Sequence, residues 1–153
     1  MKMTMKTEKV LEAYNILKAA TYQKLDDDDK IKLWKIARTL KPVATKFEED
    51  SKDAAEKLKP EGFDEILQKA QEYEQKKQKG DTDLPMTEEE YQQFLKGDWS
   101  KFNGLIAKAV KDFAEKEVEL NFEPLSESAF TKLMASNNWE MQKAMTLGEL
   151  IVE

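Results

Sequence analysis

A run of apolar residues at helical spacing between Lys30 and Leu58 constrains the fold more than any other feature of this sequence. The residues recur every three or four positions, which places them on one face of an α-helix about 42 Å long. The members of this stripe are Leu33, Ile36, Ala37, Leu40, Val43, Ala44, Phe47, Ala54 and Leu58. Because other elements or a partner must cover the stripe, we predict a helical protein built around one long helix.

Pro42 lies inside this helix, where it removes one backbone donor and crowds the carbonyl of Arg38. The chain therefore either kinks at Pro42 or breaks there into two helices. The stripe continues in phase beyond the proline, which favours the kink. Asp26–Asp29 precede the stripe, and their carboxylates can cap free amides at the helix start and complement its positive end.

Further amphipathic helices are indicated by the same periodicity and by residues typical of helix ends. Thr7 and Ser126 are expected N-caps, and Thr87 with Glu90 matches a capping box. Gly80 fits the left-handed cap at the end of a helix. We predict these helices over residues 7–21, 63–79, 87–96, 99–116, 126–135 and from about 139 onward.

Several short segments are expected to interrupt or end the helices. Residues 80–86 are polar and rich in helix breakers, so we expect a flexible joint there within a single domain spanning residues 1–153. Gly97 and Asp98 are expected to separate two helices, and Asn137 or Asn138 to cap the last one. In the helix over 99–116, the residues expected to point inward are Phe102, Leu105, Ile106, Ala109, Val110 and Phe113.

Residues 117–125 have the period of a half-buried strand, because Val118, Leu120 and Phe122 alternate with polar residues. The only comparable apolar run is 147–152, which either pairs with this strand or forms a C-terminal helix. We therefore predict a mainly α fold: a multi-helix bundle of about six or seven helices, with one long kinked helix and at most a short β pairing near 117–125.

The residue types that are missing exclude several kinds of active site. The chain has no His and no Cys, which removes the commonest general base, thiol nucleophiles, disulfides and thiolate metal sites. The five glycines are too widely spaced for a dinucleotide-binding or P-loop motif, and no G-x-S-x-G is present. We therefore expect no catalytic residue and no cofactor.

The acidic clusters do not match a metal site. Consecutive carboxylates in Asp26–Asp29 point in different directions, so we interpret them as a helix start. Asp81 and Asp83 begin like a calcium loop, but Met86 stands where the turn needs glycine and Gln92 where it needs glutamate. We expect no metal.

Charge and hydropathy restrict the partners. The formal net charge is −6 and Arg38 is the only arginine, which makes nucleic acid an unlikely main partner. Lysines mixed with Trp99 and Phe102 over residues 96–111 keep a nucleic-acid-associated regulator as an alternative, although Phe102 shares the apolar stripe and is expected in the core. The first twenty residues contain no uninterrupted apolar run, so we expect no membrane partner and a cytoplasmic location.

Two tryptophans are the candidate interaction residues. Trp34 lies just off the stripe of its helix, where it can cover the core edge or a partner, and Trp139 is expected to be partly exposed. The methionines at helical spacing near the C-terminus are interpreted as adaptable core filler; they are Met134, Met141 and Met145.

Three segments in order resemble a family of small uncharacterised proteins encoded by phages and prophages. They are VLEAYNILKAA from Val10, KIKLWKIARTLKPVATKFEED from Lys30, and EVELNFEPL from Glu117. The family has an A-Y-N-x-L helix, then a long I-x-x-x-I-A-R/K-x-L helix, then an E-V-x-L segment before the final helices; residues 60–105 match nothing in it. The resemblance carries over no catalytic residue. It implies a phage-derived accessory protein, encoded among morphogenesis or tail-assembly genes, that binds other proteins.

The leading hypothesis is therefore a non-enzymatic helical protein that acts through protein–protein contact as an assembly or accessory factor. A part of the long stripe left uncovered would drive association with a second copy or receive a partner helix. The alternatives are the nucleic-acid-associated regulator and, far behind, an enzyme built on carboxylates.

Overall fold

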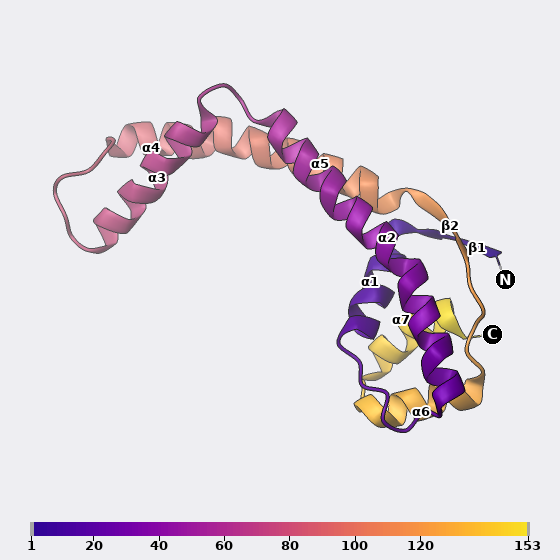
Figure 1. The fold of residues 1–153 in the computed structure, drawn as a ribbon. Coiled ribbons are helices and arrows are strands. Elements are labelled where there is room, and N and C mark those ends of the chain that lie inside the picture. The colour runs from indigo at the N-terminus through magenta and orange to yellow at the C-terminus, as the bar shows by residue number, and fades with distance from the viewer. Residues whose placement is uncertain (1, 153) are drawn as a thin grey trace. The chain divides into compact units, whose positions relative to one another are not determined.

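The computed structural model describes residues 2–152 and is mainly α-helical (Figure 1). Within these residues α4, η1 and α5 follow one another without a break, so six separate helices are present, as predicted. η1 is a π-helical turn. The elements in chain order are β1 (Lys2–Lys6), α1 (Thr7–Lys18), α2 (Asp27–Leu58), α3 (Phe63–Gln78), α4 (Glu88–Phe94), η1 (Leu95–Trp99), α5 (Ser100–Glu115), β2 (Glu117–Asn121), α6 (Glu127–Asn137) and α7 (Met141–Ile151).

The described residues divide into two compact units. The first unit contains the chain up to Asp50 and from Asp112 onward, and the second unit contains Ser51–Lys111. α2 and α5 contribute residues to both units. Each unit has its own apolar core, because no buried residue of one core cluster belongs to the other unit.

The long helix α2 begins as predicted. Asp26 caps it, accepting a hydrogen bond of 2.9 Å on its carboxylate from the backbone N–H of Asp29. This bond lowers the pKa of the Asp26 carboxyl, whereas desolvation and then the nearby Asp26 charge raise the pKa of Asp29. The helix is continuous through Pro42, so the alternative of two separate helices is wrong. Four residues of the stripe are fully buried in the first unit: Leu33, Ile36, Leu40 and Ala44.

The strand predicted over residues 117–125 is present over Glu117–Asn121, and the alternative in which residues 147–152 pair with it is wrong. β2 pairs antiparallel with β1, with Met3 opposite Leu120 and Met5 opposite Val118. The run 147–152 lies largely in α7, which confirms the C-terminal helix instead. Only a single parallel bridge joins Leu125 to Val152, with the Leu125 N–H donating to the Ile151 carbonyl at 2.7 Å. A ladder needs a second extended segment, and β1 supplies it.

Two predicted caps have other partners. Thr7 is the first residue of α1 rather than its N-cap, and its hydroxyl donates to the backbone carbonyl of Lys116. The prediction that Asn137 or Asn138 caps the last helix is also wrong, because α7 begins after Glu140. Asn138 instead adopts the left-handed conformation that ends α6, and the Asn137 amide bonds to the backbone of Thr21. By contrast, Ser126 caps α6 as predicted, accepting from the Ala129 N–H.

The expected break at Gly97 and Asp98 is absent. The chain makes one π-helical turn there and continues into α5, because a π-turn absorbs one extra residue without ending the helix. Phe63 packs against Phe102, with ring centroids 4.5 Å apart, and stacks on Trp99, so Phe102 lies in the second core as predicted. The rest of the expected inward face of α5 is half-buried at Ile106, Ala109, Val110 and Phe113, whereas Leu105 is exposed. No residue of α5 is fully buried.

In the first unit, α1 packs against α7, and the core fills the space between α1, α2, α6, α7 and the β pair. The core side chains are Val10, Ala13, Leu17, Leu25, Leu33, Ile36, Leu40, Leu120, Phe122, Leu125, Ala129, Phe130, Leu133, Leu147, Leu150 and Ile151. None of the helices described is both long and apolar enough to cross a membrane.

Candidate functional site

The core covers one apolar face of α7 and leaves Met141 and Met145, on another face of the same helix, exposed. Leu133 of α6 and Leu147, Leu150 and Ile151 of α7 are fully buried. A groove of about 460 Å³ lies between the two helices, and the core residue Phe130 and its neighbour Met134 contribute to its walls. The groove residues are Glu127, Phe130, Thr131, Met134, Met141, Ala144, Met145, Gly148, Glu149 and Val152.

Large apolar side chains stand exposed in this groove. Met141 is 78% exposed and Met145 is 59% exposed, although they lie six and two residues before the buried Leu147. Of these methionines, only Met134 packs against the core as filler. The interpretation of Met141 and Met145 as core filler is therefore wrong. Because α7 is apolar on two faces, the small core covers one of them and leaves the other exposed.

The floor of the groove depends on Gly148. A Cβ placed on this residue would lie 3.3 Å from Cε1 of Phe130, which is tighter than an ordinary contact. The missing side chain therefore lets α7 approach the Phe130 ring closely. Phe130 and Gly148 both line the groove, together with the exposed methionines.

The charged side chains that line the groove are all acidic and lie at one of its ends. Of the described residues that line it, only Glu127 and Glu149 are charged, and neither forms an ion pair within residues 2–152. Lys132 of α6 does not line the groove, and its charge acts on Asp26 and Asp29. The two carboxylates lie at the same end of the groove. Glu127 follows Leu125 closely, Glu149 precedes Val152, and a β-bridge joins Leu125 to Val152. The groove thus has an acidic end and, near Met134 and Met141, an uncharged end.

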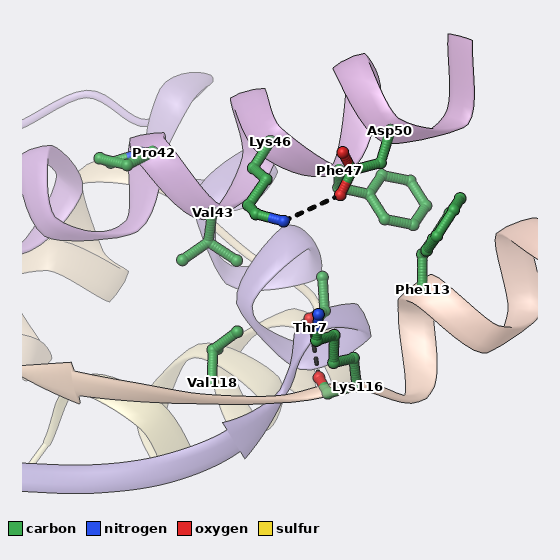
Figure 2. Close-up of a pocket in the computed structure, with 9 residues that line it drawn as sticks. All are labelled: Thr7, Pro42, Val43, Lys46, Phe47, Asp50, Phe113, Lys116 and Val118. Carbon is green, nitrogen blue, oxygen red and sulfur yellow. Dashed lines mark hydrogen bonds and ion pairs between the residues drawn. The ribbon is translucent and has the colours of Figure 1, made fainter. Parts of the chain in front are cut away.

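A second cavity of about 230 Å³ lies in the first unit, between α2 and the region where α5 leads into β2 (Figure 2). Of its polar groups, Lys46 pairs with Asp50 at 3.1 Å, and the Thr7 hydroxyl donates to the backbone carbonyl of Lys116, whose side chain also lines the cavity. The remaining walls are apolar and come from Pro42, Val43, Phe47, Phe113 and Val118. Because its walls are mainly apolar and its acidic residue Asp50 is paired with Lys46, this cavity is a packing space more than a reactive centre.

A third cavity of about 350 Å³ lies beside the π-helical turn in the second unit. Glu90 lines it, but its carboxylate accepts the Thr87 N–H in the capping box. Asp98 and Lys69 are the other charged residues of its wall. Within the part of the chain that the structure describes, no group of three or more acidic side chains is arranged to hold a metal ion.

The two candidate tryptophans lie apart from the groove. Trp34 of α2 is 58% exposed and lies beside the exposed Ile31, with the Arg38 guanidinium 5.3 Å from its ring centroid. Trp139 is half-buried and packs against the first core. Neither lines the groove between α6 and α7, which sequence reasoning missed. The sequence feature that could have predicted the groove is a second apolar stripe along residues 141–152, formed by Met141, Met145 and Val152.

Comparisons of this chain with protein-family models, with curated proteins and with solved structures found no match. Function is therefore inferred from the residues themselves.

Proposed function

We propose that this protein is non-enzymatic and acts by binding another protein, with the groove between α6 and α7 as its contact surface. The exposure of Met141 and Met145 beside Phe130 carries this proposal. Complete burial of a methionine side chain is worth about 1.5–3 kcal/mol, so a partner that covers both gains free energy. Unbranched thioethers also adapt to different partner surfaces, as in other methionine-rich docking sites.

The phage-derived accessory role belongs to the same proposal. The order of the segments beginning at Val10, Lys30 and Glu117 supports it, through the resemblance to phage and prophage proteins. On this view the partners are phage assembly proteins. A role in assembly requires repeated, reversible contact rather than chemistry, which suits a groove whose lining is mainly apolar and whose two carboxylates, Glu127 and Glu149, are exposed.

A nucleic-acid role receives less support. The aromatic residues of the 96–111 segment would need free ring faces to stack on bases. Trp99 and Phe102 instead pack against Phe63. The contacts of these rings therefore favour protein binding over base stacking.

Site-specific photo-crosslinking tests the proposal in cells that express the protein with its neighbouring genes. A photoreactive amino acid is placed at position 145 in one variant and at position 143 in a matched control, since Lys143 is exposed on α7 but does not line the groove. We expect a discrete protein adduct from position 145 and none, or a much weaker one, from position 143. Equal labelling from both positions, or no protein adduct from position 145, would overturn the proposal.

A further inference from the structure

We infer that the occupant of this groove is an amphipathic helix of about three turns, docked with a basic end beside Glu127 and Glu149. This inference rests on the proposed function of the groove and specifies the chemistry of the partner. Three observations carry it: the spacing of the lining residues, the length of the groove and the position of its charges.

The spacing of the lining residues matches a helix-in-groove contact. On α6 they fall at positions 127, 130, 131 and 134, and on α7 at 141, 144, 145, 148, 149 and 152. Both series follow the three- and four-residue period of a single helix face. Two such ridges flank a furrow that accepts the apolar side chains of a third helix at matching spacing.

The length of the groove sets the length of its occupant. From Met141 to Val152 the α7 side of the groove spans about 16 Å at the rise of an α-helix. A helix of the same length has three turns and presents apolar anchors at i, i+3 or i+4, and i+7. An extended strand fits less well, because the lining residues of an α-helix do not offer a row of unpaired backbone groups.

The charges give the occupant a direction. Glu127 and Glu149 share one end of the groove and have no ion-pair partner in residues 2–152, so a Lys or Arg of the occupant can pair with them. The opposite end, near Met134 and Met141, offers only apolar contact. A second copy of this chain is a poorer occupant, because each copy carries a net charge of −6 and the copies repel.

Fluorescence anisotropy with designed peptides tests this inference on the full chain. The probe is a labelled three-turn amphipathic helix with leucines at i, i+3, i+4 and i+7 and two lysines at one end. A second peptide is identical except that glutamates replace the lysines. In low salt we expect the lysine peptide to bind about tenfold tighter than the glutamate peptide, with the difference shrinking as salt is added.

Three variants locate the binding. Met145→Glu places a charge in the groove and should abolish binding of both peptides, whereas Gln142→Glu adds the same charge to an exposed position of α7 outside the groove and should change little. The double variant Glu127→Gln with Glu149→Gln should bind both peptides with the same affinity. Circular dichroism confirms that each variant keeps its helical content.

The outcomes separate this inference from the proposed function. Equal affinity of the two peptides for the wild-type chain, or binding that survives Met145→Glu, overturns the inference while adducts at position 145 still support protein binding. Concentration-dependent dimerisation in sedimentation, lost in Met145→Glu, would make a second copy the occupant and would also overturn it. If the photoreactive residue at position 145 gives no protein adduct in cells, the proposed function itself is rejected.

Discussion

Thr7 donates two hydrogen bonds to the same acceptor, the backbone carbonyl of Lys116: its N–H at 2.9 Å and its hydroxyl at 2.7 Å. Thr7 is the one fully buried polar residue among those described. The pair of bonds joins the start of α1 to the start of β2, next to the last rung of the ladder between Lys6 and Glu117. It therefore fixes where the β pair ends and the first helix begins.

Removing the hydroxyl of Thr7 should weaken the first unit. Thr7→Val keeps the shape and the backbone bond but loses the side-chain donor, so we expect a loss of about 1 kcal/mol in unfolding free energy. Urea unfolding followed by circular dichroism measures it. Thr4→Val is the matched control, because Thr4 is exposed in β1 and should be near neutral. Equal effects of the two substitutions would contradict this role of the hydroxyl.

The carboxylates at the start of α2 should make the free energy of unfolding depend on pH in the acidic range. The pKa of Asp26 is lower in the folded state, so its contribution is complete above the unfolded value of 3.8 and is lost as pH falls through the folded value. The raised pKa of Asp29 acts in the opposite direction: its charged form opposes folding as pH rises through 3.8. The two effects partly cancel in the wild-type chain.

Substitutions separate the two carboxylates. Asp26→Asn keeps a capping acceptor and should retain stability at neutral pH, whereas Asp26→Ala should lower the urea midpoint. Asp28→Ala is the control, since Asp28 makes no capping bond. Urea midpoints measured between pH 2.5 and 7 should fall less steeply on acidification for Asp26→Asn than for wild type. Identical pH profiles would show that Asp26 does not supply the acid sensitivity.

Adjacent positions of α2 should differ sharply in their effect on stability. Leu33 is buried in the first core, so Leu33→Ala should cost about 2–5 kcal/mol through the cavity that it leaves. Trp34 is 58% exposed and its main contact is the Arg38 guanidinium, so Trp34→Ala should cost less than about 1 kcal/mol. Denaturant unfolding of both variants tests the burial pattern. A large loss for Trp34→Ala would place that ring in a core.

Glycines in two conformations should respond oppositely to alanine. Gly80 has φ of 78°, where a side chain is strained, so Gly80→Ala should destabilise by about 1 kcal/mol. Gly104 lies in the interior of α5 with open space around its Cα, so Gly104→Ala should stabilise by roughly 0.5–1 kcal/mol through helix propensity. Thermal unfolding of the pair gives the signs. The same sign for both would contradict the left-handed cap at Gly80.

Peroxide should oxidise the groove methionines first. Met141 and Met145 are exposed, whereas Met134 packs against the core, so their sulfoxides should form fastest. Peptide mapping by mass spectrometry over a time course measures the order. The designed lysine peptide should slow oxidation at positions 141 and 145 and leave unchanged the rate at Met86, which packs against the second core and does not line the groove. If Met134 were oxidised faster than Met141 and Met145, the exposed face of α7 would not be the one that carries these two methionines.

Residue types and their spacing are enough to predict the features whose partners are close along the chain. Asp26, Thr87 and Ser126 each bond to a backbone N–H three residues later, so the residue types and their spacing suffice to predict these caps. The long helix through Pro42 and the helix over residues 147–151 are likewise consistent with local periodicity.

Features whose partners are distant along the chain depend on how the helices and strands pack together. The Thr7 hydroxyl bonds 109 residues away, and the Asn137 amide bonds to Thr21, 116 residues away, so both were misread as local caps. The same holds for the strand partner and for Met141 and Met145. An apolar stripe indicates that a helix face is more stable when it is shielded from water. Whether the core covers that face depends on how many neighbouring elements compete for the same space.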